Sequence, residues 1–197
     1  MGKEQDSNYY DQQWTSQKWK KNWNQISRVR TRLYEQAALM VPEKSPLVID
    51  LGCGGGHFGQ AMKVTNPPEM YIGYDFSEAA IFMAKKKLGH GGQFQFFQSD
   101  LGQMTLGNTI PPGGCFVCLE VLEHIKDDLR IFSLIPEGSQ MVISVPTFDD
   151  PGHVRHFQSW QKVLDRYRPF IDPATIKQKA IWQWFLFTAI RKNNETQ

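Results

Sequence analysis

The chain has 197 residues, of which 41% are hydrophobic, and a formal net charge of +2. This length and composition suit one globular domain with a sizeable core. A charge so close to zero gives no general case for nucleic acid or a membrane surface as partner, and no apolar run reaches the roughly 18 residues of a spanning helix.

The cysteines and the N-terminus indicate the compartment. Cysteine occurs three times, at positions 53, 115 and 118. A small, odd number does not build a disulfide framework and suits a reducing environment. The polar stretch "MGKEQDSNYYDQQW" lacks the apolar core of a signal peptide. We therefore expect a cytoplasmic protein.

The first forty residues predict a helical segment ahead of the main domain. Apolar residues recur at helical spacing at Val29, Leu33 and Ala37, and Pro42 ends the pattern. No repeat or low-complexity linker follows. We expect one domain over residues 1–197, with 1–42 as an N-terminal helical lid and 43–192 as the core.

Strands and helices alternate through the core. Strands are expected at 47–52, 70–76, 93–100, 114–121 and 140–146, and a closing pair at 174–181 and 182–192. Helices are expected at 57–64, 77–89, 127–135 and 159–170. This order predicts an α/β fold, a three-layer sandwich around a mostly parallel sheet. Such sheets bind ligands at the carboxyl ends of their strands.

A glycine-rich turn follows the first strand, in "LVIDLGCGGGHFGQ". A shifted frame, Gly54, Gly56 and Gly59, fits the G-x-G-x-x-G pattern of dinucleotide sites. In that pattern the first glycine directly follows the strand, whereas here Gly52 does so. Read from Asp50, the stretch is D-x-G-x-G-x-G, so a cofactor with a cationic amino group fits better than NAD. Glycines allow the backbone to turn tightly and approach a ligand closely.

This pattern resembles motif I of the class I, Rossmann-like, S-adenosylmethionine-dependent methyltransferases. Asp75 ends the second strand, where the resemblance implies contact with ribose hydroxyls, and Asp100 ends the third, where it implies contact with adenine. "CLEVLEHI" resembles the motif after strand four that faces the methionine part. The cofactor-binding residues implied are Asp50, Gly52, Cys53, Gly54, Gly56, Asp75, Phe76, Asp100, Leu101 and Leu119. The alternative is that the three aspartates are turn residues without a ligand.

The resemblance extends from about residue 47 to residue 190 and implies a seven-stranded sheet ending in an antiparallel strand pair. Within this superfamily the chain most resembles the methyltransferases that act on small molecules, which include the ubiquinone-pathway group and the type 11 and type 12 groups. The implied cofactor is S-adenosylmethionine, with S-adenosylhomocysteine as product. The implied reaction is transfer of a methyl group to oxygen, or less favourably nitrogen, of a small-molecule acceptor, because no recognition domain for a macromolecule is appended.

Candidate catalytic residues follow strands four and five. "EVLEHIKDD" carries Glu120, Glu123 and His124, which share a face if the segment is helical, and "GHVRHF" adds His153 and His156. His124 or His156 could act as a general base near neutral pH, with Glu120 beside it. Alternatively, a divalent metal could be held by Glu120, Glu123, His124 and His156, since two methyltransferase subgroups, one acting on the 2′-oxygen of small RNA and one in the ubiquinone pathway, carry a similar E-x-x-E-H. In the third interpretation the segment only shapes the loop.

The N-terminal arm leaves a second function open. Its aromatic residues alternate with lysines, a composition that can bind nucleic acid, and they are Tyr9, Tyr10, Trp14, Trp19, Trp23, Lys18, Lys20 and Lys21. A lid over the site is the favoured interpretation. The alternatives are an RNA 2′-O-methyltransferase with a metal bound by Glu and His, and a catalytically silent cofactor-binding protein that serves a partner.

Overall fold

The structure, a computed structural model, describes residues 2–16, 28–106 and 114–192. Its centre is a seven-stranded sheet with the order β3-β2-β1-β4-β5-β7-β6. The strands are β1 (Leu47–Leu51), β2 (Met70–Asp75), β3 (Phe94–Gln98), β4 (Cys115–Cys118), β5 (Gln140–Pro146), β6 (Lys177–Ile181) and β7 (Trp184–Ile190). The first five are parallel, while β7 runs antiparallel to both β5 and β6. The predicted mostly parallel sheet with an antiparallel closing pair is confirmed.

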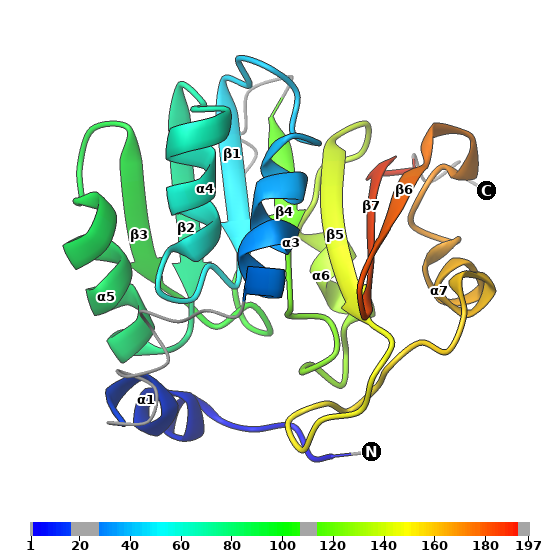
Figure 1. Cartoon of the computed structure of the whole chain (residues 1–197), viewed down its shortest axis with the longest axis horizontal. Coiled ribbons are helices and arrows are strands. Elements are labelled where there is room, and N and C mark those ends of the chain that lie inside the picture. The colour runs from blue at the N-terminus through cyan, green and yellow to red at the C-terminus, as the bar shows by residue number, and fades with distance from the viewer. Residues whose placement is uncertain (1, 17–27, 107–113, 193–197) are drawn as a thin grey trace.

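Helices cover both faces of this sheet (Figure 1). They are α1 (Ser7–Thr15), α3 (Arg28–Ala38), α4 (His57–Thr65), α5 (Glu78–Leu88), α6 (Leu129–Ser133), α7 (Trp160–Tyr167) and the short 3₁₀ helix η1 (Pro173–Thr175). Within the described residues, none of these helices has the length and apolar character needed to cross a membrane.

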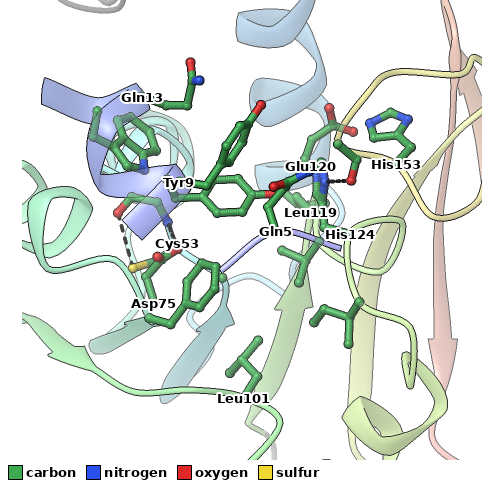
Figure 2. A pocket seen from close by; sticks show the side chains of 18 of the residues that line it. Gln5, Tyr9, Gln13, Cys53, Asp75, Leu101, Leu119, Glu120, His124 and His153 are labelled. Carbon is green, nitrogen blue, oxygen red and sulfur yellow. Dashed lines mark hydrogen bonds between the residues drawn. The ribbon is translucent and has the colours of Figure 1, made fainter. Parts of the chain in front are cut away.

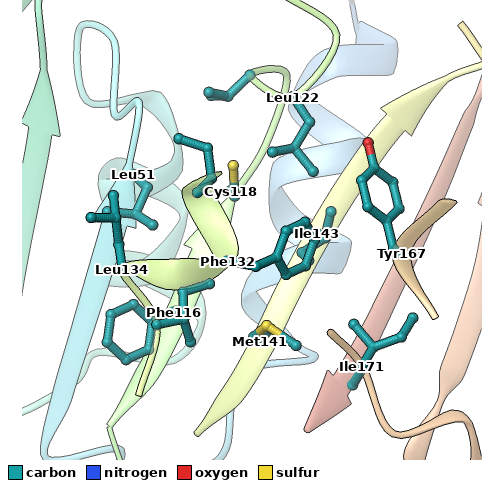
Figure 3. Packing of buried hydrophobic residues seen from close by; sticks show 14 of the residues in the cluster. Leu51, Phe116, Cys118, Leu122, Phe132, Leu134, Met141, Ile143, Tyr167 and Ile171 are labelled. Carbon is teal, nitrogen blue, oxygen red and sulfur yellow. The ribbon is translucent and has the colours of Figure 1, made fainter. Parts of the chain in front are cut away.

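Successive side chains along each strand point to opposite faces of the sheet and pack into two separate hydrophobic cores. In β1, Leu47, Ile49 and Leu51 pack on the α6 and α7 side, whereas Val48 points to the α3, α4 and α5 side. Figure 3 shows the first of these cores, with Phe132 of α6 lying over the sheet beside Ile143. Because both faces are covered, β1 is buried along its whole length.

Helix α5 begins close to the edge where the parallel strands end. Ser77 is its N-cap, and the Ser77 side chain accepts a hydrogen bond from the amide of Ala80. Glu78 lies in the first turn and three lysines in the last, in agreement with the helix dipole. The predicted helix at 77–89 is confirmed, and its N-terminus directly follows Asp75 and Phe76.

The strand order creates a crevice at one edge. The chain runs from β1 outward to β2 and β3, and then returns to β4 on the other side of β1. The turns after β1 and β4 therefore diverge, which is the position where open α/β sheets bind ligands. Helix α1 lies across this edge and packs against α5 (Figure 1).

The two outer strands of the sheet differ in charge. Strand β6 carries Lys177 and Lys179 on an exposed edge. Strand β3 has the sequence FQFFQ, without a charged residue, and its second half is exposed.

Candidate active site

A cavity of about 540 Å³ opens at the carboxyl edge of the sheet. This volume is in the range of small-molecule sites. Figure 2 shows Asp75 and Cys53 on one side of the cavity and Glu120, His124 and His153 on the other, with Gln5 and Tyr9 of the N-terminal segment between them. All of the expected cofactor-binding residues line this cavity except Gly56.

The glycine turn has the close packing that its sequence predicts. Gly52 has a φ of +84°, and a Cβ there would lie 2.3 Å from a methyl carbon of Val121. A side chain at this position is therefore excluded by both backbone conformation and space. Gly56 acts differently, because it is the residue before α4 and faces Ala84 of α5 rather than the cavity.

Asp75 is fixed by two backbone amides. One carboxylate oxygen accepts from the amide of Gly54 at 2.9 Å, and the other accepts from the amide of Ser77 at 2.9 Å. Burial raises the pKa of Asp75 to about 6, while these amide bonds act in the opposite direction. The carboxylate thus joins the glycine turn to the end of β2, and each oxygen keeps a lone pair for a ligand hydroxyl.

Asp50 lies deeper, at the end of β1. It is almost completely buried, and the hydroxyl of Tyr71 donates a hydrogen bond to it. Burial raises the pKa of Asp50 to about 7, and the Tyr71 bond partly offsets that rise. Asp100, in contrast, is exposed at the cavity margin and accepts hydrogen bonds from the Gly102 amide and from Gln103.

The segment after β4 is a turn rather than a helix. Glu120 has a φ of +59°, and its amide donates to the hydroxyl of Ser144 in β5 at 3.0 Å. A glutamate in the left-handed region of backbone conformation is unusual, and such conformations concentrate at functional sites. Glu120 and His124 line the cavity, but the helical spacing considered for residues 120–124 does not apply.

Glu123 is fully buried behind this turn. Neither of its carboxylate oxygens has a hydrogen-bond partner among the described residues. Burial, together with the nearby carboxylate of Glu120, raises the pKa of Glu123. Arg30 of α3 approaches the pair, with its Nε 3.9 Å from an oxygen of Glu120.

Two histidines meet beside Glu123. The rings of His124 and His153 are 4.9 Å apart between centroids. His124 Nδ1 lies 2.9 Å from the carbonyl of Gly152, and His153 Nδ1 lies 3.2 Å from the carbonyl of Phe148. A carbonyl only accepts, so each Nδ1 carries the proton and each Nε2 is left with its lone pair.

Burial lowers the pKa of both rings, to about 4 for His124. Ligand atoms of Glu123, His124 and His153 all lie within 4.8 Å of one another, so these three residues could hold a metal ion. His156 does not line the cavity, and its Nδ1 lies 3.9 Å from Asp149. The structure therefore brings His153, not His156, to the cluster with Glu123 and His124. The sequence does not distinguish two histidines three residues apart in a loop.

The N-terminal segment contributes one wall of the cavity. Tyr9, Tyr10 and Trp14 of α1 all line it. The other aromatic and basic residues considered for this arm, Trp19, Trp23, Lys18, Lys20 and Lys21, lie outside the described residues.

His57 is a cavity residue that the sequence does not reveal, since the first residue of a helix after a glycine turn is typically a surface position. Its ring is stacked on Tyr34, with centroids 6.1 Å apart, and on Trp14, with centroids 6.5 Å apart. Burial lowers the pKa of His57 to about 3, so the ring is neutral. Tyr34 and Arg30, from α3, also reach the cavity.

Known proteins share the fold that carries this cavity. A family model described as a methyltransferase domain matches residues 19–180. No curated protein matches the chain. Magnesium protoporphyrin IX methyltransferase from Synechocystis PCC 6803, solved with bound S-adenosylhomocysteine, has a TM-score of 0.67 at 17% identity, over 95% of this chain and 100% of that one.

Two further solved structures are similar over most of their length. The N-methyltransferase NodS from Bradyrhizobium japonicum WM9, in complex with S-adenosylhomocysteine, has a TM-score of 0.68 at 14% identity, over 95% of this chain and 98% of that one. A putative methyltransferase in complex with the Haloferax volcanii Trm112 activator has a TM-score of 0.70 at 13% identity, over 93% of this chain and 98% of that one. These likenesses establish a shared fold.

Proposed function

The chain belongs to the methyltransferase-domain family, and from that premise we propose that this S-adenosylmethionine-dependent methyltransferase moves a methyl group to an oxygen of a small-molecule acceptor. The observation that carries the proposal is one cavity with two different sides. Asp75 and the glycine turn form one side, and His124 and His153 form the other. S-adenosylhomocysteine bound to two proteins of the same fold supports the cofactor assignment.

The residues on the first side fit this cofactor. Asp75 is already held by two amides and offers its remaining lone pairs to a pair of hydroxyls. Apolar side chains that can enclose a flat base also line the cavity: Phe76, Leu101 and Leu119. When bound, the cofactor supplies an electrophilic methyl group on a sulfonium. The protein's task is then to hold the acceptor in line with it.

The histidines on the second side fit an oxygen acceptor. A hydroxyl group loses its proton as it is methylated, so a nearby base assists the reaction. The lowered pKa of His124 keeps its ring neutral at pH 7, with Nε2 able to accept a proton. The covering of the cavity by residues of α1 favours a small acceptor over a macromolecule.

A second candidate is an RNA 2′-O-methyltransferase that uses a divalent metal. The observation in its favour is the group formed by Glu123, His124 and His153, in which Glu123 is buried without a hydrogen-bond partner among the described residues. Both histidines are oriented through Nδ1, as metal-binding histidines usually are. Carboxylate and imidazole ligands suit several divalent ions. In this second candidate the metal would be held by Glu123, His124 and His153, whereas the set expected from the sequence also had Glu120 and had His156 in the place of His153.

One experiment separates these functions from a catalytically silent cofactor-binding protein. The protein is titrated calorimetrically with S-adenosylhomocysteine and, in parallel, with NAD. Micromolar binding of the first alone is expected, and preference for NAD would refute the cofactor assignment. Small hydroxylated acceptors and a short RNA are then assayed for methyl transfer, with added Mn²⁺ or with EDTA. Transfer to a small hydroxyl in EDTA supports the first candidate, metal-dependent transfer to RNA supports the second, and cofactor binding without transfer to any acceptor supports the silent protein.

A further inference from the structure

The N-terminal segment is attached to both sides of the cavity. At one end, the amide of Gly2 donates to the carbonyl of His153 at 2.7 Å, and Glu4 accepts from the amide of Lys126 at 3.3 Å. At the other end, Trp14 stacks on His57 at the start of α4. Residues 2–15 therefore extend over the cavity from the loop after β5 to the helix that follows the glycine turn.

Asp11 makes the polar attachment of α1 to the cofactor side. One of its oxygens accepts from the hydroxyl of Ser77 at 2.5 Å and from the amide of Ala79 at 3.1 Å. Both donors belong to the N-terminal end of α5, where the helix dipole favours a negative charge. Ser77 also donates its amide to Asp75. Ser77 thus contacts both Asp75, which is expected to bind the cofactor, and Asp11, which holds α1.

Tyr10 precedes Asp11 and faces the cavity. Its ring lies 5.3 Å from the ring of Phe76 and 5.9 Å from that of His124, measured between centroids. Its hydroxyl is buried and has no hydrogen-bond partner among the described residues. A buried hydroxyl without a partner is unfavourable. Burial also raises the pKa of Tyr10, so the hydroxyl keeps its proton and can donate.

We infer that Tyr10 contacts the bound cofactor through its hydroxyl, and that Asp11 is the positioning residue that holds Tyr10 there. The position beside Phe76, which directly follows Asp75, places Tyr10 over the cofactor side of the cavity. This inference rests on the proposed function, because it takes S-adenosylmethionine as the ligand. It adds a binding residue from α1 and a reason for the docking of this helix.

Tyr10→Phe tests the contact. Its affinity for S-adenosylhomocysteine, measured by calorimetry, is expected to fall by about two- to tenfold, the net effect of one hydrogen bond. Tyr74→Phe is the matched control, because the Tyr74 ring stacks on Phe97 and does not line the cavity. Equal affinities of the two variants would overturn the assignment of Tyr10.

Asp11→Ala tests the positioning role, with Gln12→Ala as control because Gln12 is exposed on the same helix. Dissociation of S-adenosylhomocysteine, followed by stopped flow, is expected to be about tenfold faster in Asp11→Ala, the scale of one hydrogen bond to a charged group, and unchanged in Gln12→Ala. The double variant of Tyr10→Phe and Asp11→Ala should bind no more weakly than Asp11→Ala alone, since residues acting as one unit are not additive.

The outcomes distinguish a failure of this inference from a failure of the proposed function. Additive losses in the double variant would show that Asp11 does not act through Tyr10. Binding by the wild type with all variants unchanged would overturn this inference and leave the proposed function intact. Failure of the wild-type protein to bind S-adenosylhomocysteine would refute both. Thermal unfolding of each variant verifies that it is folded.

Discussion

The hydroxyl of Tyr71 in β2 donates a hydrogen bond to Asp50 at the end of β1. Both residues are almost completely buried. The bond gives a buried acid a donor at the point where the chain leaves the sheet and enters the glycine turn, so the turn that lines the cavity depends on a contact behind it.

Tyr71→Phe is expected to destabilise the protein in a pH-dependent way. The pKa of Asp50 is raised above its ordinary value of 3.8 to about 7, so Asp50 makes folding less favourable as the pH rises from about 4 to 7. Without the Tyr71 hydroxyl the charged form loses a donor. The free energy of unfolding of Tyr71→Phe should therefore be lower than that of the wild type by about 1–3 kcal/mol at pH 8, where Asp50 is charged, and by much less at pH 5. Urea unfolding at both values measures this, and an equal loss at pH 5 and pH 8 would contradict it.

Asp75→Ala is expected to weaken the binding of S-adenosylhomocysteine. The change removes an acceptor for ligand hydroxyls and also releases the Gly54 amide. Hydrogen bonds to a charged group contribute about 1.5–3 kcal/mol, so calorimetry should register a loss of roughly ten- to hundredfold. Glu78→Ala, a nearby exposed acid on α5, is the charge-matched control. Unchanged affinity in Asp75→Ala would remove this residue from the cofactor site.

His124→Asn and His156→Asn separate the two histidines proposed from the sequence. Only His124 of these two lines the cavity. Once an acceptor is known, we expect turnover to fall by about 10²–10⁴-fold in the first variant, as for loss of a general base, and to change little in the second. The affinity for S-adenosylhomocysteine should be retained in both. A larger effect at His156 would show that the loop after β5 adopts another arrangement during catalysis.

His57→Phe is expected to reduce the acid sensitivity of the fold. Because the pKa of His57 is lowered from 6.5 to about 3, its contribution to stability is complete above pH 6.5 and is lost progressively as the pH falls toward 3. Phenylalanine can keep the stacking on Tyr34 without titrating. Between pH 7.5 and pH 5, the variant should lose roughly 2 kcal/mol less stability than the wild type. The same loss in both proteins would indicate that His57 titrates normally.

The sheet could be predicted from the sequence because its signals are local. Short apolar runs ended by acidic residues indicate the strands. The glycine turn after the first strand indicates where the backbone can come close to a ligand. Asp75 could be placed at the cavity edge from sequence alone, since a residue at the end of a parallel strand has only one edge of the sheet to occupy.

The side of the cavity formed by Glu120, His124 and His153 depends on contacts between segments that are far apart in the sequence, so no local pattern predicts it. Glu120 follows β4 with a left-handed backbone conformation, and its amide donates a hydrogen bond to Ser144 on the neighbouring strand β5. Residues 120–124 therefore form a turn and not the helix considered from the sequence. The choice between His153 and His156 depends on the path of the loop after β5, in which the carbonyl of Phe148 orients the ring of His153 while His156 lies beside Asp149. The position of Tyr10 depends on a bond between residues 66 positions apart in the chain.

The unequal charge of the two outer strands has a consequence for self-association. Lysines on β6 oppose the approach of another strand, because an incoming chain would have to desolvate or displace them. The FQFFQ strand at the opposite end offers no such repulsion. If the sheet is ever continued from one molecule into another, in a crystal or in a concentrated solution, the added strand is expected beside β3, and Phe97→Lys should suppress that association.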